Sequence, residues 1–399
     1  MAKPACRPHS SPRPRLLRSL SGLLRLLPLL AVLLPLLCLP GPAAGNPDAD
    51  KIKIAAVFSE SGIAAPHNQP LIEMTKLAVR KINEAGGLLG KPVQLLLLDN
   101  LSTPIGSAMA ARKCVEQQVT AVIGAHWSSH SLAMAPILEE AGIPMISPGS
   151  TNPEVTKGKR FIFRACFIDS FQGLAMAKFA YTNLAARTAV VATAIDEDYS
   201  TMLGQFFSRA FQKAGGKVLA EVGYRGNATD FSSNIRTIEQ HRPDVVYLPG
   251  YTRDSGLFIK QAVKMGIRAT FLGGDAWDEI ETYAGEAVNG SFQSTPWHPG
   301  VPYPASEEMK RFFKAAYGRE IANNSSPLAY DAVMLLADAI TRAGSTDRGA
   351  IRDALAATRN FQGATGSITF DENGDPVDKG IIIIAFKDGK RVFTQTIQP

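Results

Sequence analysis

From residue 51 onward, short runs rich in β-branched and apolar residues alternate with longer segments in which apolar positions recur at helical spacing. This alternation is typical of parallel βαβ units, in which a helix connects each strand to the next. One such helix is predicted over residues 71–84, because Gly86 and Gly87 follow it as a stop signal. The predicted strands are residues 51–58, 93–99, 121–123, 144–147, 161–166, 189–194, 217–222, 245–248 and 270–272.

The alternation changes after Thr295. Four prolines between residues 296 and 304 interrupt it, and no strand is predicted between the helices that follow. A hairpin then closes the pattern, because Asp388 and Gly389 are residues that a tight two-residue turn favours. The predicted helices are residues 306–316, 328–342 and 348–356, and the hairpin strands are residues 381–387 and 391–396.

These elements predict an α/β protein with two doubly wound parallel sheets, each the centre of one lobe. The first four strands form one sheet, and the strands between residues 189 and 272 form the other. The first lobe comprises residues 46–166 and 296–371, and the second comprises residues 167–295 and 372–399. The chain therefore crosses between the lobes three times, which suits a hinge. Ligands of such folds bind at the carboxyl ends of the strands, here in a cleft between the lobes.

Residues 1–45 predict a secretory signal peptide. They hold six basic residues, no acidic residue and an apolar run over residues 26–39 that prolines interrupt. Cleavage after Gly45 predicts a mature start near Asn46 and export to the periplasm. The net charge of +6, from 42 basic and 36 acidic residues, disappears with this segment, because 42 minus 6 leaves 36 of each sign. The equal numbers of basic and acidic residues after position 45 give no support for a nucleic-acid partner.

Candidate chemistry other than binding finds little support. His126 and His130 are four residues apart, but a third metal ligand is lacking nearby, so neither a metal nor another cofactor is expected. No GxSxG, P-loop or GxGxxG motif occurs, which leaves nucleophilic or nucleotide hydrolysis without its usual cue. A secreted hydrolase remains an alternative that turnover would reveal. Cys114 and Cys166, the cysteines that follow the predicted leader, are expected to be separate buried thiols, with a disulfide between them as the alternative.

Polar residues follow several predicted strands. Ser128 and Ser129 begin a helix, where the first-turn N–H groups and hydroxyls form an anion seat, although simple helix capping is the commoner use of serine there. Tyr199, Tyr251 and Asp275 each follow a strand of the second lobe. An aspartate at this place pairs with an ammonium group and tyrosines enclose it, whereas the alternatives are capping and ordinary packing.

The segment IPMISPGSTNPEVT over residues 143–156, with GAHWSSHSLAMAPILEEAG before it and FIFRACFIDSFQG after it, resembles the branched-chain amino-acid-binding proteins of bacterial ABC transporters. These belong to the type I periplasmic binding proteins, and the similarity extends from residue 51 to about residue 387. The resemblance implies a monomeric receptor without a catalytic step, which binds a small amino acid and delivers it to a membrane ABC permease. A sensory role is an alternative, as is an amide, urea or small aromatic acid as ligand.

The resemblance also implies roles for individual residues. Ser129 and the loop of Gly149, Ser150 and Thr151 match the positions that hold the ligand's α-carboxylate and α-ammonium groups. On the second lobe, Tyr199, Tyr251 and Asp275 align with ligand contacts. The chain departs from the family pattern at Asp275, where glutamate is frequent, and at His67, where an aromatic residue is frequent in the loop after the first strand. Trp127 and Trp277 flank the expected site, and either tryptophan limits the ligand's side chain or serves as a structural aromatic.

Overall fold

A five-stranded parallel sheet begins the part of the chain that the computed structural model describes, residues 51–399. The predicted signal peptide, residues 1–45, lies outside this part. The strand order is β2-β1-β3-β4-β5, so the chain winds outward in both directions from β1 and β3. The sheet holds five strands instead of the predicted four, because residues 162–164 pair in parallel with β4. The strands are β1 (Ile52–Phe58), β2 (Val93–Asp99), β3 (Ala121–Gly124), β4 (Met145–Ser147) and β5 (Ile162–Arg164).

The second sheet has seven strands in the order β14-β13-β10-β9-β8-β6-β7. It is parallel except for β13, which runs antiparallel to both of its neighbours. The sequence did not predict β10, whose four residues FQST lack a clear apolar pattern. The strands are β6 (Thr188–Ala194), β7 (Lys217–Tyr224), β8 (Val245–Tyr247), β9 (Thr270–Gly273), β10 (Phe292–Thr295), β13 (Ile381–Lys387) and β14 (Lys390–Ile397).

The predicted tail hairpin is present and belongs to this second sheet. Asp388 and Gly389 both have positive φ, 51° and 69°, as a type I′ turn requires. The four isoleucines Ile381–Ile384 are all buried, and they attach the hairpin to the core of the sheet.

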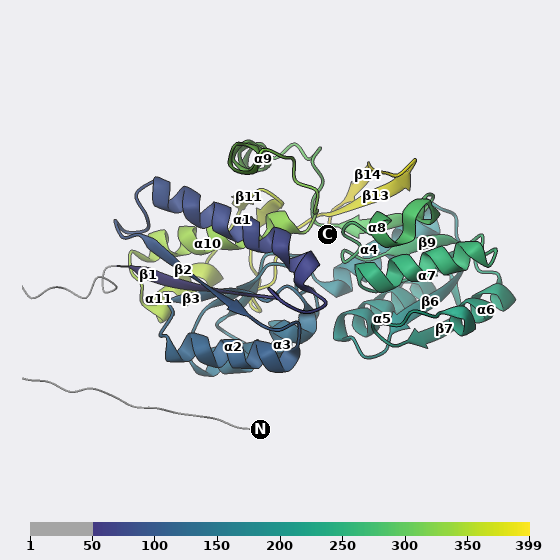
Figure 1. The fold of residues 1–399 in the computed structure, drawn as a ribbon, viewed down its shortest axis with the longest axis horizontal. Coiled ribbons are helices and arrows are strands. Elements are labelled where there is room, and N and C mark those ends of the chain that lie inside the picture. The colour runs from purple at the N-terminus through teal and green to yellow at the C-terminus, as the bar shows by residue number, and fades with distance from the viewer. Residues whose placement is uncertain (1–50) are drawn as a thin grey trace, which may run out of the picture. The chain divides into compact units, whose positions relative to one another are not determined.

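Helices cover the faces of both sheets (Figure 1). The first helix starts before the predicted residue 71. Pro66 lies in its first turn, where a missing N–H loses no intrahelical hydrogen bond. The helix continues past Pro70, which cannot donate a backbone hydrogen bond of its own. The helices are α1 (Ala65–Glu84), α2 (Pro104–Glu116), α3 (Ser128–Glu140), α4 (Asp169–Thr182), α5 (Asp198–Lys213), α6 (Ser232–His241), α7 (Thr252–Lys264), α8 (Glu281–Ala284), α9 (Pro304–Tyr317), α10 (Ser326–Ala343) and α11 (Arg348–Ala356).

The three helices α9, α10 and α11, which follow β10 in the chain, pack with elements of the first lobe. Helix α10 contacts α1, α11, β3 and β4, and α9 also contacts α1. Two 3-10 turns and a two-stranded ladder complete the described fold, and the sequence predicted none of these four elements. They are η1 (Pro153–Val155), η2 (Gly285–Val288), β11 (Phe361–Gly363) and β12 (Gly366–Ile368).

Two buried thiols lie in separate places. Cys114 and Cys166 are both unpaired, as predicted, and burial raises the pKa of each to about 12. Within residues 51–399, no helix combines the length and the apolar character that crossing a membrane requires.

A buried arginine ties the first crossing between the sheets to the third. Arg164, at the end of β5, is fully buried, and its Nε donates to Asp375 Oδ1 over 2.6 Å. The same guanidinium donates to the carbonyl oxygens of Ser150 and Asn152 and to the Thr156 hydroxyl, over 2.5, 3.0 and 2.6 Å. A buried charge needs this full set of partners, so the loop after β4 and the third crossing are held in place together.

Replacing Arg164 with methionine should lower the free energy of unfolding by about 3–5 kcal/mol, because Asp375 and two buried carbonyls then lose their donor. Urea unfolding followed by circular dichroism measures the change. Arg160→Met is the matched control, because Arg160 is exposed and its loss should cost less than about 0.5 kcal/mol. Equal effects of the two substitutions would contradict the structural role of Arg164.

Candidate binding site

Polar and aromatic residues from five loops gather where the two sheets present the carboxyl ends of their strands. The first lobe contributes the loops after β3 and β4, and the second contributes those after β6, β8 and β9. Parallel strands bring these ends to one edge of each sheet, so residues far apart in sequence meet there. The residues are Trp127, Ser128, Ser129, Gly149, Ser150, Thr151, Tyr199, Tyr251 and Asp275.

A row of stacked rings connects the two lobes at this place. The Trp127 ring of the first lobe lies on the Tyr251 ring of the second, with centroids 3.9 Å apart and planes 15° apart. Tyr251 in turn stacks on Tyr199 at 5.4 Å, and Trp127 stacks on His130 at 5.4 Å. We call these four rings the aromatic row. Its direct contact between Trp127 and Tyr251 means that the lobes are closed on each other here.

Asp275 lies at the second-lobe end of the row and is 6% exposed. Its Oδ1 accepts hydrogen bonds from Tyr199 Oη over 2.9 Å and from Gln172 Nε2 over 2.8 Å. Burial raises the pKa of this carboxyl, and the two hydrogen bonds offset part of the rise. Asp275 is thus oriented by neutral donors and has no cationic partner within residues 51–399.

Asp169 is a second buried carboxylate, which the residue-by-residue prediction missed. It is fully buried in the first turn of α4, and neither of its oxygens accepts a hydrogen bond of good geometry from residues 51–399. Burial and then the charge of Asp275 raise its pKa well above the usual range, against a smaller opposing effect of the Thr151 hydroxyl. In the sequence, Asp169 looks like an ordinary acidic residue in the first turn of a helix. Only the structure, in which the charge of Asp275 acts on it, marks Asp169 as a candidate site residue.

On the first lobe, the structure separates the residues of the expected anion seat. Ser128 is buried, and its hydroxyl accepts from the Asn152 backbone N–H over 3.3 Å, which turns it toward the loop after β4. Ser129 is half-buried, and its side chain makes no hydrogen bond within residues 51–399. The Ser150 hydroxyl is turned away to first-lobe acceptors, Ser131 Oγ at 2.8 Å and the His126 carbonyl at 3.0 Å. The Thr151 hydroxyl is buried and lacks a hydrogen-bond partner of good geometry in the described chain.

Three further expected residues have different surroundings. Gly149 must lack a side chain, because a Cβ there would lie 2.3 Å from His126 Nδ1. His67 belongs to the first turn of α1 and not to the preceding loop as expected, and it lines a narrow pocket beside Trp127 and Tyr251. Trp277 is fully buried in the apolar core, where it packs against Gly273 and near Phe386. Its surroundings are those of a structural aromatic.

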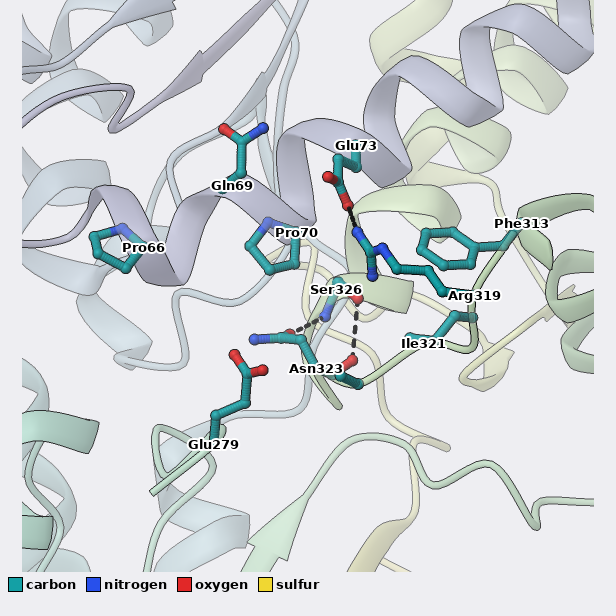
Figure 2. Close-up of a pocket in the computed structure, with 11 residues that line it drawn as sticks. Pro66, Gln69, Pro70, Glu73, Glu279, Phe313, Arg319, Ile321, Asn323 and Ser326 are labelled. Carbon is teal, nitrogen blue, oxygen red and sulfur yellow. Dashed lines mark hydrogen bonds and ion pairs between the residues drawn. The ribbon is translucent and has the colours of Figure 1, made fainter. Parts of the chain in front are cut away.

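A separate pocket of about 200 Å³ lies between α1 and the segment before α10, and Figure 2 shows its lining. Arg319 pairs there with Glu73 over 2.5 Å, and Asn323 Oδ1 accepts from the Ser326 backbone N–H over 2.7 Å. These pairs occupy most of its polar groups, and Glu279 of the second lobe also lines it. Asp169 and Asp275 form no ion pair within residues 51–399, so the chemistry favours the strand ends around them as the candidate site. No cluster of three His, Cys, Asp or Glu side chains within residues 51–399 could hold a metal ion.

Comparisons with known proteins point in the same direction. The model of the family described as periplasmic binding protein matches residues 51–390. The leucine-, isoleucine-, valine-, threonine-, and alanine-binding protein of Pseudomonas aeruginosa is 30% identical over 348 residues, which cover 85% of this chain and 91% of that protein. A leucine-binding protein from Thermotoga maritima superposes with a TM-score of 0.83 and 40% identity, over 87% of this chain and 99% of that one.

A third similar protein was solved with a ligand. It is the branched-chain amino acid transporter substrate-binding protein from Streptococcus pneumoniae in complex with isoleucine. The TM-score is 0.81 at 29% identity, and the alignment covers 88% of this chain and 100% of that one.

Asp169→Asn should stabilise the protein when no ligand is added. Because the pKa of Asp169 is higher in the folded chain than in the unfolded chain, its ionised form weakens the fold, and this cost grows as pH rises above about 4. The variant lacks the cost, so its free energy of unfolding at pH 7 should exceed the wild-type value by about 1–3 kcal/mol, and the difference should vanish near pH 4.

Urea unfolding at pH 4, 5.5 and 7 tests this expectation. Asp353→Asn is the control, because the Asp353 side chain is 70% exposed and its substitution should change little. A variant that is less stable than wild type at pH 7 would mean that Asp169 is favourably paired in the folded protein.

Proposed function

Because the chain belongs to the periplasmic binding protein family, we propose that it is an extracytoplasmic receptor that encloses a small aliphatic amino acid between its lobes. The observation that carries this proposal is the pair of buried carboxylates, Asp169 and Asp275: the charge of Asp275 raises the pKa of Asp169, and neither carboxylate forms an ion pair within residues 51–399. Leaving two such charges unpaired is costly, and an incoming ammonium group compensates both.

The first lobe supplies the partners for the other end of the amino acid. The first-turn N–H groups of α3 favour an anion, and the Ser128 and Thr151 hydroxyls lie beside them. Ser128 is better suited than Ser129 to hold the α-carboxylate, because it is buried and turned toward the loop of Gly149 and Thr151. In this arrangement both charges of the zwitterion gain partners when they leave water.

The proposed ligand class is aliphatic. The Pseudomonas relative is named for leucine, isoleucine, valine, threonine and alanine, and the Streptococcus structure holds isoleucine. An aromatic acid, an amide or urea would bring no cation to Asp169 and Asp275. These carboxylates therefore favour an amino acid over those alternatives.

Ligand uptake in this proposal is a shift between open and closed lobes and involves no chemical conversion. The ligand favours the closed form because only there do Asp275 and Ser128 contact the same molecule. The receptor works as a monomer in the periplasm, and its closed form delivers the amino acid to the permease of an ABC importer. Unchanged recovery of the ligand distinguishes this role from that of a secreted hydrolase.

A thermal-shift screen of the protein against single amino acids, urea, small amides and benzoate should show stabilisation by leucine, isoleucine or valine. Binding at about a thousandfold above the dissociation constant adds about 4 kcal/mol, which raises the melting temperature by several degrees. Prior partial unfolding and dialysis removes co-purified ligand. Stabilisation by benzoate or urea alone would refute the amino-acid assignment.

Asp275→Ala should weaken the binding of the amino acid by at least about thirtyfold, because it leaves the ammonium with one carboxylate and a hole beside it. Titration calorimetry measures the affinity, and Asp353→Asn again serves as the exposed control. Wild-type affinity in Asp275→Ala would place the ammonium elsewhere.

A serine pair tests the other end of the ligand. Ser128→Ala should reduce affinity by about tenfold or more, the usual effect of losing one hydrogen bond to a charged group. Ser129→Ala, one residue along the same helix turn, should change it by less than about threefold. The reverse order would assign the carboxylate to Ser129.

A further inference from the structure

We propose that the pocket of about 200 Å³ beside Glu279 is a second ligand site, which takes a small organic cation and thereby favours the closed lobes. We call it the side pocket. Its lining comes from both lobes, because Glu279 belongs to the second, whereas Gln69, Arg319 and Asn323 belong to the first (Figure 2). The site does not depend on the proposed function, but its effect on amino-acid affinity rests on that function.

The side pocket carries one uncompensated negative charge. Of its three charged residues, Arg319 and Glu73 pair with each other over 2.5 Å. Glu279 accepts no hydrogen bond and joins no ion pair within residues 51–399. Arg391, on which the charge of Glu279 acts, is already paired with Glu281 over 2.8 Å. The free carboxylate of Glu279 therefore favours a ligand with a single positive charge.

Asn323 adds a hydrogen-bond donor that has no partner. The residue is 2% exposed, and its Oδ1 accepts from the backbone N–H groups of Ser325 and Ser326 over 3.0 and 2.7 Å. These bonds turn the Nδ2 group into the pocket, where it donates to no atom of residues 51–399 (Figure 2). Donors of buried residues are rarely left unpaired, so this group marks the place of an oxygen acceptor on the ligand.

A hydrogen bond between the lobes fixes the two sides of the side pocket. Asp278, the neighbour of Glu279, is 5% exposed, and its Oδ1 accepts from the Asn324 backbone N–H over 2.9 Å. The Asp278 carbonyl accepts in turn from the Thr252 hydroxyl over 3.1 Å. Glu279 itself has a φ of 57°, which is unfavourable for a residue with a Cβ. The contacts of Asp278 hold this backbone in place before a ligand arrives.

Size and lining define the class of ligand. A volume of about 200 Å³ is the share of about seven water molecules, so the pocket has room for about six or seven non-hydrogen atoms. Pro66, Pro70 and Ile321 supply apolar surface. The ligand that fits is a short amine with a hydroxyl or carbonyl oxygen at its other end. Its ammonium group pairs with Glu279, and its oxygen accepts from Asn323.

A ligand in the side pocket contacts both lobes at once. It stabilises the arrangement in which Asp278 reaches Asn324. In the same arrangement Trp127 lies on Tyr251, so the lobes are closed. Two ligands that favour one conformation raise each other's affinity, so the amine acts as an effector of amino-acid binding.

Titration calorimetry with 4-amino-1-butanol, 1,4-butanediol and 4-hydroxybutyrate tests the site, because these probes are similar in length and differ in charge. The amine should bind wild type at least about tenfold more tightly than the other two, the usual effect of one hydrogen bond to a charged group. Glu279→Gln should abolish this preference. Glu286→Gln is the matched control, because Glu286 is exposed and lies outside the pocket lining. Thermal unfolding establishes that each variant is folded.

Equal binding of the three probes to wild type would overturn the proposal. Wild-type affinity for the amine in Glu279→Gln would overturn it too, because the amine would then occupy another site, such as the one at Asp275.

A second titration tests the effector role. A saturating concentration of 4-amino-1-butanol should raise leucine affinity at least about fivefold in wild type and leave it unchanged in Glu279→Gln. Unchanged or lowered leucine affinity in wild type would overturn this role. If wild type binds no amino acid at all, the proposed function fails, and the amine titrations still decide whether the side pocket is a site.

Discussion

Two buried carboxylates that form no ion pair within residues 51–399 set the main constraint on this protein. Asp169 is the first residue of α4, after the first crossing, and Asp275 follows β9. Their charges interact only because the fold brings these two segments together. Mutual repulsion and burial both oppose their ionisation. A fold that retains such a pair sacrifices stability, which is common at binding sites and rare in structural cores.

Two further sets of contacts connect this pair to the rest of the region between the sheets. Arg164 holds the loop after β4 against the third crossing, so the Thr151 hydroxyl stays beside Asp169. The aromatic row joins the lobes over the same place and ends on Asp275 through Tyr199. In the proposed function, charge recognition and lobe closure are therefore parts of one connected set of contacts, through which binding energy changes the balance between two conformations.

Much of this fold could be predicted from the chain, because strand and helix periodicities are local properties. The alternation after residue 51 and the Asp388–Gly389 turn both correspond to observed elements. The short strand β10 could not be predicted, because its pairing with β9 and β13 is non-local. Of the site, the residues after strand ends were predictable by position. Asp169 was not, because its importance arises from a neighbour 106 residues away, at position 275. Burial likewise separates Ser128 from Ser129, and the stack on Tyr251 separates Trp127 from Trp277.

The place of the hairpin in the second sheet has a consequence for the order of folding. Strand β13 fills the position between β10 and β14, yet it is separated from β10 by all of α9, α10 and α11. Until residues 381–387 arrive, the edge of β10 keeps its backbone groups unpaired and open to wrong partners. The second lobe therefore reaches its final sheet only after the helices of the first lobe have been synthesised. The two lobes cannot mature one after the other along the chain, and their folding is coupled by topology.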